Sequence, residues 1–206
     1  PIHLIADTEG IEVKYPNYLS DEDYNYFLKS KPDLVVVVAY GKLIPKKFLE
    51  IRNLLFINLH ASLLPKWRGA APIQRALLNL DKETGVSIMK ITHGLDEGPY
   101  MKQVKVKIEK KTNSGELKKK LSSLGAQAII DSLKTISLKG EQFVNQDESK
   151  STYAKKIVKS ETKIDWSSEA KYILGKINAF NPKPGAWFEY KNKRIKVLEA
   201  DEVIKH

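Results

Sequence analysis

The chain has 206 residues, of which 42% are hydrophobic and 29% charged, which is ordinary for a globular protein with one sizeable core. It contains no cysteine, which excludes disulfide bonds, thiolate nucleophiles and cysteine-based metal sites, and no apolar run is long enough to span a membrane. The net charge of +10 is uneven: residues 1–100 hold twelve basic and twelve acidic residues, whereas residues 101–206 hold twenty-three and thirteen. A polyanion bound by the second half and a lysine-covered, solvated surface explain this asymmetry equally well.

The first 50 residues alternate between helix and strand signals. Ser20 is followed by three acidic residues, which is typical of a helix N-cap and first turn. The continuous β-branched run at 34–39 predicts a central parallel strand that is buried on both faces. The expected elements are the end of a helix with a turn at Gly10 (1–12), a strand (11–15), a helix (20–29), a strand (34–39) and a short helix (45–50).

A short apolar strand over residues 54–57 leads directly into Asn58 and His60. Residues two apart in a strand point to the same face, so an amide and an imidazole lie side by side where the strand ends. In open α/β sheets ligands bind beyond the carboxyl ends of the strands, which makes this pair a candidate catalytic site. A turn asparagine and a hydrogen-bonded structural histidine are the alternative. The long connection that follows, stiffened by Pro65 and Gly69, favours a binding loop.

The rest of the chain continues the βα pattern, which predicts an α/β fold with an open, mostly parallel, Rossmann-like sheet. No glycine-rich dinucleotide motif or phosphate loop is present, so the sequence does not support nucleotide binding of those kinds. The expected elements are helices at 72–79 and 113–137, a strand at 84–91, an antiparallel strand at 101–108, a helix capped by Ser167 or Ser168 and ending at 179, a turn at 181–185, and strands at 187–190 and 194–200.

Three segments carry a resemblance to a known family. The run SLLPKWRGAAPIQRAL at 62–77, preceded by Asn58 and His60, and the loop GLDEG at 94–98 resemble the formyltransferases that use 10-formyltetrahydrofolate. The stretch AFNPKPGAWF at 179–188 resembles the link into the C-terminal domain of the members that formylate methionyl-tRNA. The resemblance covers nearly the whole chain and implies a one-carbon transferase of translation initiation.

The resemblance also implies roles for particular residues. Asp96 lies in the loop after the next strand, where its carboxylate can hold a protonated His60 or accept the amine's proton through water; a solvated turn is the alternative for this Asp-Glu-Gly sequence. His93, in the same loop, matches no family motif and is left out. The expected catalytic residues are Asn58, His60 and Asp96, and the expected folate-binding residues are Ser62, Leu63, Leu64 and Pro65. For the last four, packing of the two leucines onto the core is the alternative.

The expected co-substrate is 10-formyltetrahydrofolate, with no metal, and the expected partner is initiator methionyl-tRNA. We expect a monomer that is not bound to a membrane, in the bacterial cytoplasm or an organelle matrix. The domains are expected to be a formyltransferase domain at 1–140, a polar linker at 141–160, and the start of a C-terminal, OB-like, tRNA-binding β-barrel at 161–206.

Family members usually begin with a further strand-helix-strand unit and a basic loop, so we expect this chain to be trimmed at both ends. Two alternatives to the methionyl-tRNA reading stay open. One is a formyltransferase acting on an amino-sugar nucleotide or glycinamide ribonucleotide, and the other is a non-catalytic RNA-binding module.

Overall fold

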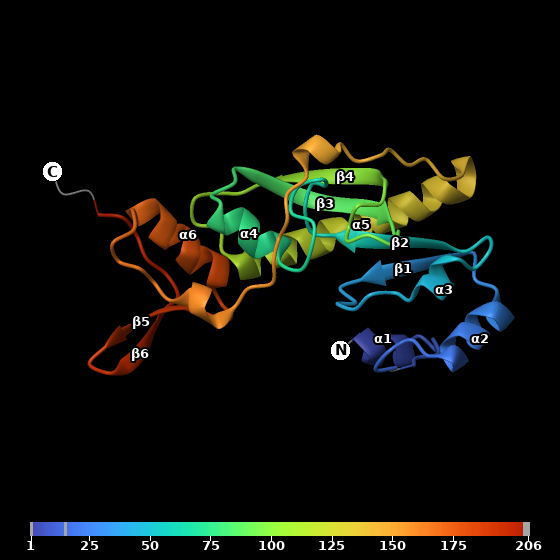
Figure 1. Cartoon of the computed structure of the whole chain (residues 1–206), viewed down its shortest axis with the longest axis horizontal. Coiled ribbons are helices and arrows are strands. Elements are labelled where there is room, and N and C mark those ends of the chain that lie inside the picture. The colour runs from blue at the N-terminus through green and yellow to red at the C-terminus, as the bar shows by residue number, and fades with distance from the viewer. Residues whose placement is uncertain (1, 15, 204–206) are drawn as a thin grey trace.

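The computed structural model describes residues 2–14 and 16–203 (Figure 1). The helices are α1 (Ile2–Thr8), α2 (Asp21–Ser30), α3 (Lys46–Leu49), α4 (Pro72–Leu78), α5 (Ser114–Lys139) and α6 (Ala170–Phe180), with short 3-10 turns η1 (Glu148–Lys150) and η2 (Lys159–Thr162). The strands are β1 (Leu34–Val38), β2 (Leu55–His60), β3 (Glu83–Lys90), β4 (Tyr100–Lys107), β5 (Ala186–Tyr190) and β6 (Lys193–Val197).

The main sheet has the strand order β1-β2-β3-β4, which confirms the α/β class in the form of a mixed sheet. β1 runs parallel to β2, whereas the β2–β3 and β3–β4 pairs are antiparallel, so the expected parallel arrangement holds only for the first pair. The expectation that residues 34–39 form a central strand is wrong, because β1 lies at the edge of the sheet. Val36 and Val38 remain exposed there. A β-branched run reports strand propensity, but the number of neighbours is decided elsewhere in the chain.

The region before β1 is partly helical. α2 begins as predicted: the Ser20 hydroxyl accepts from the Asp23 N–H and the Asp23 carboxylate accepts from the Ser20 N–H, which forms a capping box. Residues 11–14, by contrast, do not form the predicted strand, and residue 15 lies outside the described residues. Ile11 is exposed, so the alternating pattern there has no sheet or core to pack against.

Helix α5 covers one face of the sheet. Its start is capped by Asn113 and Glu116, as predicted. Its apolar side chains join residues of β2, β3 and β4 in the main core. Gly125 leaves room for a side chain of the sheet: a Cβ at this position would lie 2.6 Å from Cδ2 of Leu59, so the Leu59 side chain packs directly against the backbone of α5. This contact shows that Leu59 faces α5, and the neighbours of Leu59 along β2 therefore face the opposite side.

The C-terminal part packs onto the same core. α6 lies against α4, and its N-cap is Glu169 rather than either predicted serine. Ile177, Phe180 and Ala186 are fully buried in one cluster with the sheet residues. The β5–β6 hairpin is joined to the preceding chain, where the Ile164 N–H donates to the Trp187 carbonyl at 2.6 Å. Burial at its first strand explains why this hairpin is held although it pairs only with itself.

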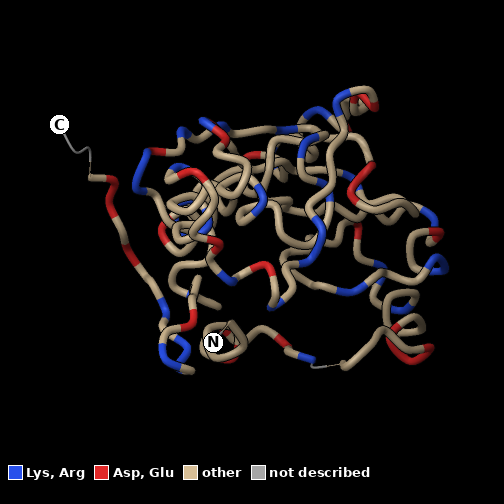
Figure 2. Tube along the Cα trace, turned by 60° about the vertical axis from the view of Figure 1, so that its left-hand side comes forward, with Lys and Arg blue, Asp and Glu red and all other residues tan. Residues whose placement is uncertain are grey.

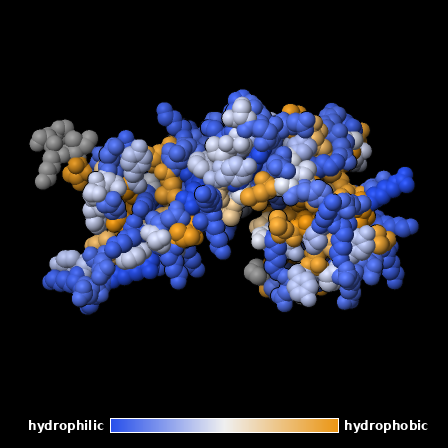
Figure 3. All heavy atoms as spheres, in the orientation of Figure 1, coloured by the Kyte–Doolittle hydropathy of each residue, from blue (hydrophilic) through white to orange (hydrophobic). Residues whose placement is uncertain are grey.

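The molecule is elongated, and its surface is hollowed between the region of α1–α3 and the region of α6 and the β5–β6 hairpin (Figures 1 and 3). The loop between β2 and α4 lies at this hollow, in the middle of the molecule. Within residues 2–14 and 16–203, no helix has the length and apolarity that a membrane crossing requires.

Candidate active site

The site is built at the carboxyl end of β2, on the face opposite to α5. Because Leu59 faces α5, Asn58 and His60 project to the other face. His60 lies beside Ser87 of β3, and Ser87 lies beside Gln103 of β4, so these three residues form one row across the sheet. The connection from β2 to α4 folds back over this row. It thereby brings residues 62–69 above the strand that they follow.

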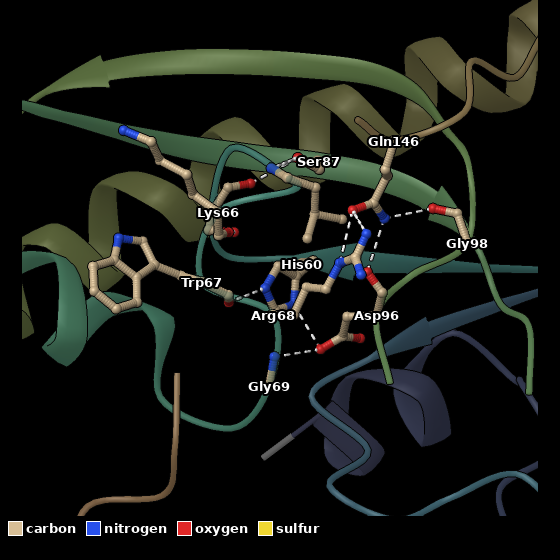
Figure 4. A network of polar contacts seen from close by, with 11 residues as sticks. His60, Lys66, Trp67, Arg68, Gly69, Ser87, Asp96, Gly98 and Gln146 are labelled. Carbon is tan, nitrogen blue, oxygen red and sulfur yellow. Dashed lines mark hydrogen bonds and ion pairs between the residues drawn. The ribbon is translucent and has the colours of Figure 1, made fainter. Parts of the chain in front are cut away.

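His60 is held at both ring nitrogens (Figure 4). Its Nε2 lies 2.8 Å from the Trp67 carbonyl oxygen, and its Nδ1 lies 3.4 Å from Oδ2 of Asp96. A carbonyl oxygen can only accept, so Nε2 carries a proton. Nδ1 faces the Asp96 carboxylate, so the ring lies between a backbone carbonyl and a carboxylate. With 5% of its surface exposed, His60 is almost enclosed. The imidazole and the carboxylate are thus held next to each other in a nearly enclosed position.

Asp96 is oriented by the same loop that holds His60. The Gly69 N–H donates to Asp96 Oδ2 at 2.8 Å, and this is the oxygen that faces His60 Nδ1. Both Trp67 and Asp96 adopt positive φ angles, 61° and 52°. Such angles are uncommon for residues other than glycine and persist where surrounding contacts enforce them. Here they accompany a carbonyl aimed at His60 and a carboxylate aimed at His60 and Gly69.

Asn58 is half-buried beside this pair. Its side chain forms no hydrogen bond with another described residue, and it lies in register with Met89 of β3. The structure therefore brings His60 and Asp96 into direct contact and places Asn58 on the same face. Since no described residue accepts from the Asn58 amide, its donor is available to a bound molecule.

The four residues expected to contact folate divide into two kinds. Ser62 and Leu64 are buried and anchor the loop to the sheet. The Ser87 hydroxyl donates to the Ser62 carbonyl at 2.7 Å and accepts from the Leu64 N–H at 3.1 Å, while Gln103 donates to the Leu64 carbonyl at 2.8 Å.

Leu63 and Pro65 are partly exposed, and Leu63 packs over Gly85. The structure therefore leaves Leu63 and Pro65 as the side chains of this segment that can form an apolar wall for a ligand. Ser62 and Leu64 support that wall from below.

A buried arginine, which the sequence interpretation did not place in the site, holds these loops together. Arg68 is 1% exposed and is the largest fully buried side chain among the described residues. Its guanidinium donates to Glu148 through both terminal nitrogens, at 2.9 and 2.6 Å. It also donates to the Gln146 side-chain oxygen at 3.0 and 2.8 Å. These bonds to Glu148 raise the pKa of Arg68, and they lower the pKa of Glu148.

Gln146 and Glu148 lie in the polar segment 141–160, where the sequence carries no motif that marks them. The structure shows that this segment crosses the site. The main chain of this segment pairs with the main chain of Arg68. The backbone N–H of Arg68 donates to the Thr152 carbonyl at 2.8 Å, and the backbone N–H of Ala154 donates to the Arg68 carbonyl at 2.6 Å. Ala154 is fully buried. The sequence marks Arg68 only by its place three residues after the expected folate-binding segment 62–65.

Other side chains and hollows lie outside this arrangement. His93 is exposed and has no contact with His60. No cluster of three or more metal-binding side chains occurs within the described residues. One cavity of about 320 Å³ lies between α4, α6 and the end of β4, and another of about 440 Å³ lies beside Arg75 and Tyr153. Neither is lined by His60 or Asp96.

Comparison with known proteins gives matches over most of the chain. Residues 12–133 match the formyl transferase family, and residues 156–206 match the formyl transferase C-terminal domain. A methionyl-tRNA formyltransferase of Pelagibacter ubique is 46% identical over 203 residues, which are 98% of this chain and 66% of that relative. The chain thus spans a little under two thirds of the length of that protein.

Two solved structures share the fold. HypX of Aquifex aeolicus in complex with tetrahydrofolic acid has a TM-score of 0.73 at 16% identity, over 85% of this chain and 30% of HypX. A sugar N-formyltransferase from a Shewanella species has a TM-score of 0.73 at 18% identity, over 90% of this chain and 76% of its own. With a family match over more than half of its residues, and the His60–Asp96 pair beside Asn58 at the end of β2, the chain belongs to the formyltransferase family.

Proposed function

We propose that this protein transfers the formyl group of 10-formyltetrahydrofolate to the α-amino group of initiator methionyl-tRNA, a step of translation initiation. The observation that carries the proposal is the enclosed His60–Asp96 pair next to an unpaired Asn58 amide. The name of the Pelagibacter relative supports this choice of acceptor.

The reaction needs a held donor carbonyl, stabilisation of an oxyanion, and a route for one proton. The amine attacks the formyl carbon, and a new C–N bond forms as the carbonyl oxygen becomes an oxyanion. We assign to the Asn58 amide the donation of a hydrogen bond to that oxygen. The bond between the formyl carbon and folate N10 then breaks, while the amine loses a proton and N10 gains one. The His60–Asp96 pair is the group in the site that can take up and return this proton.

The basic residues of the C-terminal part supply a surface for a polyanion. Figure 2 shows them along the β5–β6 hairpin, in the lower left of that view. Trp187 on this hairpin lies against two cations, with Lys163 Nζ 5.5 Å and Arg194 Cζ 4.2 Å from the ring centre. We assign residues 1–140 to the catalytic domain, 141–160 to the connection, and 161–206 to the start of the tRNA-binding domain.

Neutralising two hairpin lysines is expected to weaken tRNA binding. Lys193 and Lys196 are exposed and form no ion pair with another described residue. If both contact phosphates, changing both to Gln should lower affinity and reduce the slope of log K against log salt by about 1 per contact. Filter binding or fluorescence anisotropy across a salt series measures both quantities.

The matched control changes Lys29 and Lys42 to Gln, since these are equally exposed but lie in the neutral half of the chain. Equal affinity and equal slopes for the two double variants would show that the charge of the hairpin has no part in binding tRNA.

A second acceptor class is favoured by one observation. The Shewanella protein, whose fold this chain shares, is a sugar N-formyltransferase. An amino-sugar nucleotide presents a primary amine to the same chemistry, but it needs no extended basic surface. The two readings therefore differ in how the rate depends on salt and on the hairpin.

The test is an acceptor panel. The purified chain is incubated with 10-formyltetrahydrofolate and, in parallel, with methionyl-tRNA, an amino-sugar nucleotide or glycinamide ribonucleotide, and formylated product is quantified by mass spectrometry. We expect turnover with methionyl-tRNA at a kcat/KM at least about 10²-fold above the other two. Preferential turnover of either small acceptor would overturn the proposal.

A further inference from the structure

The tripeptide Trp67-Arg68-Gly69 touches both members of the proton-handling pair. The Trp67 carbonyl faces His60 Nε2, and the Gly69 N–H donates to the Asp96 carboxylate. Arg68 lies between these two residues, and its guanidinium is buried. Arg68 is therefore the anchor of a three-residue segment whose two outer peptide groups set the positions of His60 and Asp96.

Arg68 reaches the loop of Asp96 by a second route, through Gln146 (Figure 4). A guanidinium has donors only, so Gln146 must turn its side-chain oxygen towards Arg68. That choice directs the Gln146 amide nitrogen at the opposite side, where it donates to the carbonyls of Asp96 at 2.8 Å and Gly98 at 2.7 Å. All four bonds agree on a single orientation of the amide.

The loop that Gln146 holds is also packed against the end of β3. Gly98 lies against the Lys90 carbonyl so closely that a Cβ would overlap it, which leaves the backbone no space to shift in that direction. Leu95 and Glu97 are exposed on either side of Asp96. The Gln146 amide donates to the Asp96 carbonyl, and the Gly69 N–H donates to the Asp96 carboxylate.

We propose that Arg68 and Gln146 are positioning residues for the His60–Asp96 pair, with Arg68 orienting the Gln146 amide and Gln146 fixing the main chain of Asp96. This inference rests on the proposed function for its kinetic consequence, but its structural part is independent of the acceptor. A displacement of about 1 Å at a catalytic group can lower a rate by about 10²-fold, so the support of Asp96 is expected to appear in kcat.

The discriminating variant is Gln146→Glu. A carboxylate at this position still accepts from Arg68, so the buried guanidinium stays paired, but it has no N–H to donate to Asp96 and Gly98. The matched control is Glu141→Gln, which removes one exposed charge from the same segment and breaks only its surface ion pair with Lys90. Both proteins are first compared with wild type by thermal unfolding and circular dichroism.

For Gln146→Glu we expect kcat to fall by about 10- to 100-fold, with the KM values for folate and acceptor within about twofold of wild type. Amide hydrogen exchange of residues 91–99, followed by mass spectrometry, should accelerate while exchange of β2 and β3 is unchanged. Glu141→Gln should match wild type in both measurements.

Unchanged exchange of residues 91–99 in Gln146→Glu would overturn the inference, as would accelerated exchange with wild-type kcat. A rise in KM without a fall in kcat would also overturn it, because that result assigns Gln146 to substrate binding. If the wild-type chain formylates none of the acceptors, the proposed function fails, and hydrogen exchange alone then decides whether Gln146 holds the Asp96 loop.

Discussion

Replacing His60 by alanine is expected to lower the rate of formyl transfer by roughly 10²- to 10⁴-fold, while folate binding stays close to wild type. In the proposed reaction the imidazole belongs to the pair that carries a proton between the attacking amine and folate N10. It is also the group that Asp96 and the Trp67 carbonyl are arranged to hold. Single-turnover rates and equilibrium binding of tetrahydrofolate, measured on the same preparations, separate chemistry from binding.

The matched control is His93→Ala, which removes an exposed histidine from the loop of Asp96 without touching His60. Its rate is expected to be within about twofold of wild type. Asp96→Asn separates the charge of Asp96 from its hydrogen bond. The amide oxygen can still accept from the Gly69 N–H, but the negative charge facing His60 is lost. A His60→Ala protein that is as active as wild type would remove His60 from the mechanism.

Gly85→Ala is expected to lower the free energy of unfolding by about 1–3 kcal/mol, with the upper end favoured because backbone atoms cause the clash. A Cβ at residue 85 would overlap the carbonyl oxygen of Val104 on the adjacent strand and lie 2.5 Å from Cδ2 of Leu63. The first contact can be relieved only by moving β4. The second pushes Leu63, a side chain expected to line the folate site, away from the sheet.

We therefore expect Gly85→Ala to weaken folate binding as well as stability. Urea unfolding measures the stability change as a shift of the midpoint at constant m-value. The control is Lys105→Ala, since Lys105 is the cross-strand partner of Gly85 but projects into solvent. Loss of stability with unchanged folate affinity would show that Leu63 is not part of the binding wall. If Gly85→Ala were as stable as wild type, residue 85 would have room for a Cβ, which would contradict its close contact with the Val104 carbonyl.

The elements that could be predicted from the sequence are those with local causes. The start of α2 depends on Ser20 and Asp23, and the start of α5 depends on Asn113 and Glu116, so in each case four neighbouring residues contain the whole signal. The antiparallel direction of β4 follows from its alternation of lysine with other residues, which is typical of a strand with one solvated face. Local rules fail where an element needs a distant partner. Residues 11–14 alternate but find no strand to pair with, and β1 lies at the edge of the sheet.

The site shows the same division. Strand periodicity placed Asn58 and His60 on one face, and the family resemblance selected Asp96 and the segment 62–65. Neither could identify Arg68 as buried, because its burial depends on Gln146 and Glu148, some 80 residues away. A charged side chain is normally solvated, and only a complete set of acceptors offsets the loss of its hydration.

The sequence by itself determined the caps of α2 and α5, most of the strand segments, the family and the three candidate catalytic side chains, because these depend on neighbouring residues or on motifs that survive in linear form. Only the tertiary structure decided the order of the strands, the enclosure of His60 and the path of residues 146–154 across the site. The physical reason is that strand pairing, desolvation and hydrogen-bond satisfaction depend on groups that are far apart in the chain and meet only in the folded protein.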